Sequence, residues 1–288
     1  MSLPARCLVS FGRKRYIFPR KGEDMSFLRH ACLVPALLAG VLFAVPASAA
    51  PAQDEAAQLK ALLKAHPEIL IDVLSEHSEE LLDIVQKGSE KRRRSTLRMQ
   101  WENDLEDHKQ VDVAGRPVGG AADAPVTIVA YSDFLCSYCH QAAFTLGSLM
   151  KRYPGKIRMV YKQIPKNEAG RIAGLWFLTA YRTDKAKAWK MYALTYDRQQ
   201  AVEADVNGSM RAIAQETGFD VKKLEADMKK YAQELGALMD ADAAEAGRLG
   251  FVGTPYFLVN DIVVRGALSL ENFSDAVDMA LAHIKKKK

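Results

Sequence analysis

The sequence has 288 residues, of which 49% are apolar, and this share is sufficient for a substantial core. Its formal charge of +5 comes from residues 1–49, which carry seven Lys or Arg and two Asp or Glu, so the remainder holds 33 basic and 33 acidic residues. Because the chain is neutral beyond residue 49, it has no general attraction for nucleic acid, and we expect no nucleic-acid partner.

The N-terminal region has the three parts of a secretory signal peptide. Residues 25–30 form a short basic segment, residues 31–45 are apolar, and Ala47-Ser48-Ala49 fits a cleavage site. The apolar run is short for a membrane span. We therefore interpret residues 1–49 as a signal peptide, with Met25 as an alternative start, and expect the protein to be exported.

Residues 50–110 are predicted to form a separate helical region. Leucine, isoleucine and valine recur there at helical spacing, and Pro67 indicates that one helix ends and another begins. A third, more charged helix is expected from Lys91 to about Lys109. The apolar stripe has no evident partner within the region, so it either caps the main domain or joins copies of the chain. We favour a homo-oligomer, a dimer or a trimer, through residues 50–110.

The central motif is Phe134-Leu135-Cys136-Ser137-Tyr138-Cys139-His140. The apolar segment 125–131 before it predicts a buried strand, and residues 141–153 after it predict a helix. Cys136 is therefore expected at a helix N-terminus, where the helix dipole and free N–H groups lower the pKa of a thiol. The thiolate attacks disulfides, and Cys139, one turn further on, is placed to resolve the mixed disulfide.

The cysteine count bears on whether this pair is a redox site or a metal site. Removal of residues 1–49 takes away two of the four cysteines and leaves Cys136 and Cys139. Two thiols cannot build a four-cysteine zinc site or a structural disulfide framework, so the pair is interpreted as catalytic. A copper- or zinc-binding protein that uses both thiols and His140 stays open, since soft thiolates suit Cu(I). A holdase-like chaperone with secondary redox activity also stays open.

The rest of the chain completes an α/β pattern. Alternation predicts a strand over 157–164, and helical spacing then predicts several helices over about 168–249, of which the last two span 221–231 and 235–249. A hairpin follows, with Asn260-Asp261 as its two-residue turn, and a closing helix spans 270–284. The catalytic domain is therefore assigned to residues 111–288.

The Gly253-Thr254-Pro255 motif precedes the hairpin. We expect the Thr254–Pro255 peptide bond to be cis. A cis proline at the start of a strand turns the preceding polar groups outward, where they can pair with an extended substrate chain.

These motifs resemble those of the periplasmic thiol–disulfide oxidoreductases of the thioredoxin superfamily, DsbA type, over about residues 118–285. The resemblance rests on Tyr131-Ser132-Asp133-Phe134-Leu135-Cys136-Ser137-Tyr138-Cys139, on Gly253-Thr254-Pro255, and on the 116 residues between Cys139 and Pro255. It implies a thioredoxin-like fold with a helical insertion and a periplasmic location.

The resemblance also implies roles for residues. Cys136 is the nucleophile, Cys139 the resolving thiol and Pro255 the cis-proline, and the Cys136–Cys139 disulfide serves without another cofactor. The residues expected to bind substrate or tune the redox pair are Ser137, Tyr138, His140, Thr254 and Pro255. The helical region looks like that of the ScsC-like, suppressor-of-copper-sensitivity branch, which oligomerises through it.

Two positions depart from the family pattern. Ser137 stands where a proline usually follows the first cysteine, and Ala130 stands where relatives often have a buried acid. Thr254 resembles the isomerase-type relatives, and an oligomer would place several copies of Cys136 around one misfolded substrate.

We therefore expect a disulfide isomerase or reductase, with a DsbA-like dithiol oxidase as the alternative. The expected partners are unfolded or misfolded exported proteins with cysteines and a membrane protein that resets the redox state.

Overall fold

The computed structural model describes residues 52–286, so the interpreted signal peptide lies outside the described part of the chain. The chain divides into two compact units, Met1–Pro67 and Glu68–Lys288. The described part of the first unit is mainly helix α1 (Ala52–Ala65). The other elements lie in the second unit, apart from Pro67 at the start of helix α2 (Pro67–Glu76). No helix within residues 52–286 combines the length and the hydropathy that a membrane crossing requires.

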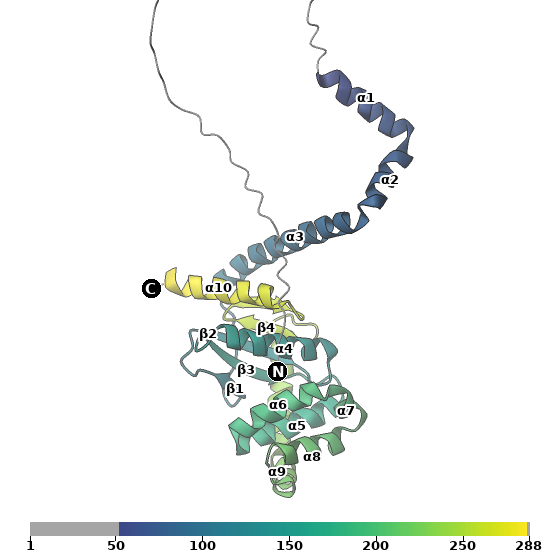
Figure 1. Ribbon diagram of the computed structural model, residues 1–288. Coiled ribbons are helices and arrows are strands. Elements are labelled where there is room, and N and C mark those ends of the chain that lie inside the picture. Colours follow the sequence, from purple (N-terminus) through teal and green to yellow (C-terminus); the bar gives the residue numbers. More distant parts are fainter. Residues whose placement is uncertain (1–51, 287–288) are drawn as a thin grey trace, which may run out of the picture. The chain divides into compact units, whose positions relative to one another are not determined.

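A five-stranded mixed sheet forms the centre of the second unit (Figure 1). Its strands are β1 (Val118–Gly120), β2 (Val126–Ser132), β3 (Ile157–Gln163), β4 (Tyr256–Val259) and β5 (Ile262–Arg265). Their order is β1-β3-β2-β4-β5, in which β2 and β3 are parallel and the other neighbours are antiparallel. β4 and β5 form the predicted hairpin, with Val259 opposite Ile262.

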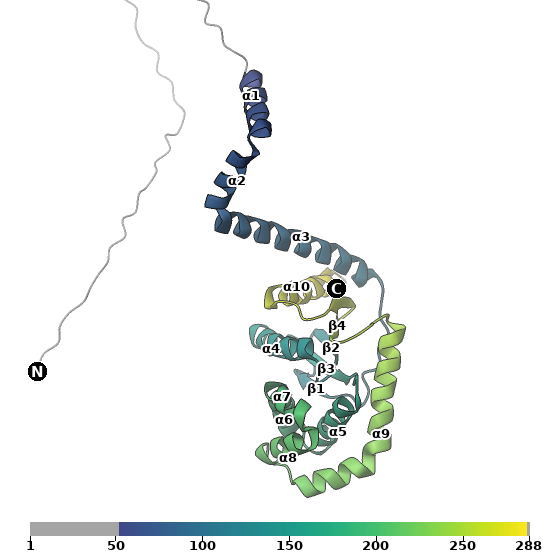
Figure 2. The same ribbon diagram turned by 90° about the vertical axis from the view of Figure 1, so that its right-hand side faces the viewer.

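Helices cover both faces of β2, which is why nearly all of its residues are buried. Ile128 and Ala130 belong to the larger core, together with residues of α4 (Ser137–Arg152) and α10 (Leu270–Lys286). Tyr131 belongs to a smaller core on the opposite face, to which Ala246 of helix α9 (Val221–Arg248) contributes. Figure 2 shows α4 and α10 on one side of the sheet and α9 on the other.

The segment between β3 and β4 is helical, as the sequence predicts. It contains α5 (Glu168–Thr183), α6 (Lys185–Asp197), α7 (Gln199–Ala204), α8 (Val206–Glu216) and α9 (Val221–Arg248). The Phe134 ring, in the loop after β2, lies between aromatic rings of this insertion and of β3. Its centroid is 5.0 to 5.7 Å from those of Tyr161, Phe177, Tyr192 and Tyr196. The thioredoxin-like fold with a helical insertion and a preceding helical region is thus confirmed.

Two helix boundaries differ from the sequence-based expectation. The two helices predicted over 221–231 and 235–249 are arms of one continuous helix, α9, which bends (Figure 2). Residues 232–234, between the two predicted helices, are Ala-Gln-Glu, which favour helix, so the helix continues across them. Helix α3 (Ser78–Glu106) likewise runs through Gly88, an exposed position where glycine costs only about 1 kcal/mol relative to alanine.

The second half of α3 covers the edge of the sheet. Trp101 is 1% exposed, and its Nε1 donates to the Val263 carbonyl at 3.1 Å. The Asp104 carboxylate accepts from the Val263 backbone N–H at 3.0 Å. These two bonds satisfy the backbone N–H and carbonyl of Val263 on edge strand β5, which would otherwise be open to another strand. This end of α3 therefore packs against the domain that was predicted to begin at residue 111.

We expect Trp101→Ala to lower the free energy of unfolding by about 3–5 kcal/mol, because it removes a fully buried aromatic side chain. Chemical denaturation followed by circular dichroism measures this change. Met99→Ala is the matched control, since Met99 lies in the same helix and is 57% exposed, and it should alter stability by less than about 0.5 kcal/mol. Equal effects of the two substitutions would contradict the packing role of Trp101.

Candidate functional site

Cys136 is the N-cap residue of helix α4. A short loop leads from the end of β2 to this position, and the Cys136 backbone is extended, with φ −95° and ψ 123°. Its carbonyl accepts the first helical hydrogen bond, from the His140 N–H at 3.0 Å. The side chain is 8% exposed, whereas that of Cys139, one turn later, is 1% exposed. The structure thus places Cys136 at the helix N-terminus, with Cys139 deeper in the protein.

The two thiols are free and have opposite pKa shifts. A hydrogen bond from the Cys139 thiol lowers the pKa of Cys136 to about 5. Burial raises the pKa of Cys139 above its usual range. At neutral pH the more accessible sulfur is therefore a thiolate and the buried one a thiol, which is the division that nucleophile and resolving group require.

Backbone and hydroxyl groups form a hydrogen-bond network next to the buried Cys139. The Asp133 N–H donates to the Cys139 sulfur at 3.4 Å. Ser132 at the end of β2 shares a hydrogen bond of 2.9 Å with the Tyr196 hydroxyl of α6. Tyr196 also contacts the Tyr161 hydroxyl at 3.1 Å. Helix α6 of the insertion is therefore hydrogen-bonded to the end of β2, directly before the redox loop.

The Thr254-Pro255 loop lies beside the first sulfur. The Thr254–Pro255 bond is cis, as expected from the sequence. The Cys136 sulfur is 3.5 Å from the Thr254 carbonyl oxygen, although 118 positions separate the two residues. Pro255 is buried, and the Thr254 side chain is one of the groups that lower the pKa of Cys136. The fold thus brings the two sequence motifs together at one end of the sheet.

The other predicted site residues lie around this pair with different exposure. Ser137 is exposed, and Tyr138 is 61% exposed. The half-buried His140 ring packs against Phe144, with the centroids 4.9 Å apart, and within residues 52–286 it has no hydrogen bond to either sulfur. Val252, two residues before Thr254, is 92% exposed. Apolar groups thus remain accessible beside both motifs.

Gln199 is a site residue that the sequence analysis missed. Its side-chain amide donates to the Phe134 carbonyl at 2.6 Å and to the Cys136 carbonyl at 3.0 Å. These bonds fix the two ends of the loop that carries the nucleophile. Gln199 is 63 positions from Cys136 and stands in a six-residue helix, so no local pattern indicates it.

Asp133 is the buried acid of this side of the sheet. The sequence has Ala130 where relatives often have an acid, but Asp133 is 1% exposed, three residues further on. Its carboxylate accepts backbone N–H groups of Leu135 at 3.2 Å and Lys166 at 3.0 Å. Burial raises the pKa of Asp133. The Asp133 carboxylate therefore holds the backbone at Leu135 and Lys166 in place through these hydrogen bonds.

A buried ionic cluster lies on the opposite face of β2 and β3. Lys162 of β3 is 0% exposed and contacts the carboxylates of Glu245 and Asp242, both from α9. Arg116 pairs with Asp242 at 3.0 Å, and the Tyr131 hydroxyl donates to Glu245 at 2.6 Å. Arg116 also pairs at 2.6 Å with Asp112, which is more exposed, so each buried charge of this cluster has a partner of opposite sign.

The residues of the redox pair do not form a metal centre in the described structure. Within residues 52–286, no three His, Cys, Asp or Glu side chains are grouped so that they could hold a metal ion.

Solved structures share this fold. A thioredoxin-like oxidoreductase from Silicibacter pomeroyi is 30% identical, with a TM-score of 0.52, over 62% of this chain and 95% of that one. ScsC of Proteus mirabilis in a transitional conformation is 22% identical, with a TM-score of 0.51, over 80% and 96%. Oxidised BdbD of Bacillus subtilis is 20% identical, with a TM-score of 0.54, over 61% and 97%.

Curated relatives match over a smaller part of their own length. The Na⁺/H⁺ antiporter NhaA 1 of Salinispora arenicola is 30% identical over 171 residues, which are 57% of this chain and 24% of that protein. The chain spans about a quarter of the length of the curated relatives that it matches. The family model described as thioredoxin matches residues 112–279. Since this match covers more than half of the chain, the protein belongs to the thioredoxin family.

Proposed function

We propose that this protein is a thiol–disulfide interchange enzyme that acts on cysteine-containing proteins. The observation that carries the proposal is the pair of sulfurs at the start of α4. Cys136 is the more accessible, has a pKa of about 5 and lies beside the Thr254 carbonyl, while Cys139 is buried one turn behind it. An extended substrate segment can pair with the backbone at Thr254 while its sulfur meets Cys136.

The exchange follows from these positions. In reduction or isomerisation, the Cys136 thiolate attacks one sulfur of a substrate disulfide, the substrate S–S bond breaks, and the other substrate sulfur leaves as a thiolate. In isomerisation, a substrate thiolate then attacks the mixed disulfide at the substrate sulfur and releases the Cys136 thiolate. In reduction, deprotonated Cys139 attacks the Cys136 sulfur instead, which forms the Cys136–Cys139 disulfide and releases the substrate sulfur as a thiolate. In oxidation, the same steps run in reverse: a substrate thiolate opens the Cys136–Cys139 disulfide, and two electrons pass from substrate to enzyme.

We favour isomerase or reductase activity. Thr254 before the proline resembles the isomerase-type relatives, and its side chain helps to lower the pKa of the reactive sulfur. Exposed apolar groups at Tyr138 and Val252 suit the binding of misfolded chains, which expose apolar side chains. An assembly of several copies would present more than one Cys136 to such a chain.

A dithiol oxidase is the second candidate, and the pKa of Cys136 favours it. A thiolate stabilised to a pKa of about 5 stabilises the reduced form relative to the disulfide, which makes the couple more oxidising. For this two-electron couple, 30 mV corresponds to about 1.4 kcal/mol, so modest differences in stabilisation select the direction.

We place the enzyme in the periplasm as an oligomer. The proposed location rests on the signal-peptide pattern of residues 1–49, and a membrane protein would reset the redox state. Assembly would occur through the apolar residues exposed on α1, α2 and the first half of α3. They are Leu59, Leu62, Ile69, Leu70, Ile71, Val73, Leu74, Leu82, Ile84 and Val85. The match to Proteus mirabilis ScsC covers 80% of the chain and so extends into these helices, which supports the ScsC-like assignment.

We expect reduced Cys136 to react with iodoacetamide at a rate that is nearly constant between pH 6 and 8. The rate should fall about tenfold per pH unit below pH 5, because only the thiolate reacts and its pKa is about 5. Cys139 should remain unmodified. Mass spectrometry of quenched samples measures both sites. Cys139→Ala removes the hydrogen-bond donor and should raise the midpoint, and an unchanged midpoint would contradict the role of that bond.

The protein is expected to reactivate ribonuclease that carries wrongly paired disulfides, and Cys136→Ser should abolish this activity. Return of ribonuclease activity under a glutathione buffer is the measurement. Rapid oxidation of reduced ribonuclease without reactivation of the scrambled form would favour the oxidase. Neither activity, in protein whose Cys136 alkylates normally, would reject the proposed function.

We expect the double variant Leu74→Asp, Leu82→Asp to have the mass of a single chain in light scattering, because charge on the exposed stripe opposes assembly. The control is Gln86→Asp with Ser89→Asp, two exposed polar positions of α3, which should keep the mass of the unmodified protein. If the unmodified protein is itself a monomer, the assembly proposal fails.

A further inference from the structure

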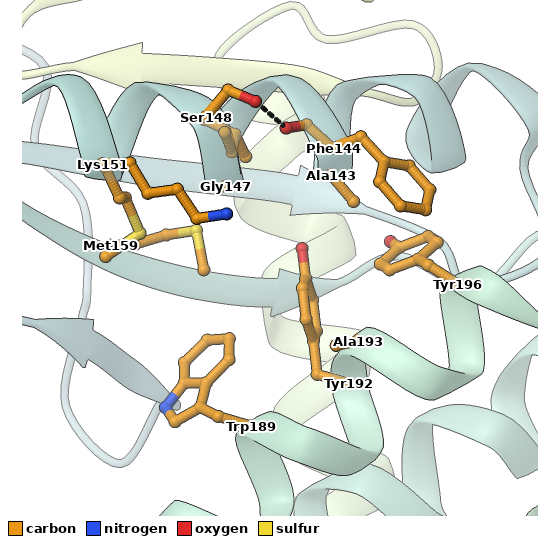
Figure 3. A pocket seen from close by; sticks show the side chains of 12 residues that line it. Ala143, Phe144, Gly147, Ser148, Lys151, Met159, Trp189, Tyr192, Ala193 and Tyr196 are labelled. Atoms are coloured by element: carbon orange, nitrogen blue, oxygen red, sulfur yellow. Dashed lines mark hydrogen bonds between the residues drawn. The ribbon is translucent and has the colours of Figure 1, made fainter. Parts of the chain in front are cut away.

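A groove separates helix α4 from helix α6 on the side of α4 that faces the insertion (Figure 3). It encloses about 370 Å³. Its walls are largely apolar, with Phe144, Met150, Met159, Trp189 and Tyr196 among them. This volume lies within the range of small-molecule sites, about 300–1,000 Å³.

Two hydrogen-bond donors point into this groove (Figure 3). Tyr192 is 9% exposed, and its hydroxyl makes no hydrogen bond to another described residue. The Lys151 ammonium group lies along the groove and forms no ion pair within residues 52–286. Burial raises the pKa of Tyr192, so its hydroxyl remains a donor at physiological pH.

The other polar groups of the lining already have partners. The Ser148 hydroxyl donates to the Phe144 carbonyl at 3.1 Å, and the Trp189 ring N–H donates to the Val118 carbonyl at 3.0 Å. The Tyr196 hydroxyl is bonded to Ser132. A ligand therefore meets apolar walls and two free donors, of which one is cationic.

We propose that this groove binds a small amphipathic carboxylic acid. Its apolar body lies against Phe144, Met159 and Trp189, and its carboxylate accepts from the Tyr192 hydroxyl and pairs with Lys151. A polypeptide segment fits the groove less well, because the apolar walls offer no partners for its backbone N–H and C=O groups. The inference is independent of the redox function, since the lining contains neither cysteine.

Decanoate, below its micellar concentration, is the test ligand for the full-length protein. We expect saturable binding in calorimetry, with a parallel change in tryptophan fluorescence that disappears in Trp189→Phe. Decanol lacks the charge and decyltrimethylammonium reverses it, so each should bind at least tenfold more weakly. Equal affinity for decanol would overturn the assignment of the two donors.

Three variants locate the ligand. Lys151→Met and Tyr192→Phe should each weaken decanoate binding about tenfold, as expected for the loss of one hydrogen bond to a charged group. Gly147→Leu should abolish binding, because a Cβ atom at Gly147 meets nothing within 4 Å and a larger side chain can enter the groove. The matched controls are Lys190→Met, on an exposed position of α6, and Gly88→Leu, where a Cβ atom is equally unobstructed.

The outcomes separate the alternatives. Iodoacetamide reactivity of Cys136 and far-ultraviolet circular dichroism establish that each variant is folded. The absence of saturable decanoate binding to the unmodified protein overturns the proposal, as does binding that Gly147→Leu leaves unchanged. If decanoate does not bind but Gly147→Leu lowers kcat/KM for a cysteine-containing peptide, the groove holds a client segment and the proposal is wrong.

Discussion

The hydrogen bond between the two sulfurs is the interaction on which the site depends. It requires Cys139 to stay a thiol, and burial against the end of β2 keeps it one. It also requires Cys136 to remain the N-cap residue of α4, where the helix N-terminus favours a negative charge. Gln199 secures this position by binding the carbonyls on both sides of the loop. The low pKa of one sulfur is therefore a property of the loop, the strand and the insertion together.

The buried ionic cluster is a second constraint, on the other face of the sheet. The ammonium group of Lys162 on β3 is buried away from water, and the carboxylates of Asp242 and Glu245 on α9 stabilise its charge. A buried cation without its partner is strongly destabilising, so the stability of β3 depends on the two carboxylates of α9. Tyr131, next to the redox loop on β2, joins the same cluster through Glu245. The last helix of the insertion is thus bound to the sheet by these ion pairs.

The sequence predicts features formed by neighbouring residues, but it does not predict contacts between residues that are far apart in the chain. The strand, the two cysteines and the helix follow one another within 27 residues, so periodicity places Cys136 correctly at the helix start. The cis bond at Thr254 follows from the motif and the resemblance. Gln199 and Glu245 reach their partners across 63 and 83 positions, and glutamine or glutamate on a helix has no pattern that distinguishes such a role from surface exposure.

Helix α6 connects the redox loop with the groove beside it. Tyr192 and Tyr196 are four residues apart and so lie on one face of the helix. The Tyr196 hydroxyl is bonded to Ser132 beneath the buried sulfur, whereas the Tyr192 hydroxyl points into the groove (Figure 3). Both rings pack on Phe134, which begins the redox motif. A molecule held by Tyr192 would therefore contact the aromatic cluster around Phe134, whose member Tyr196 is bonded to Ser132 at the end of β2.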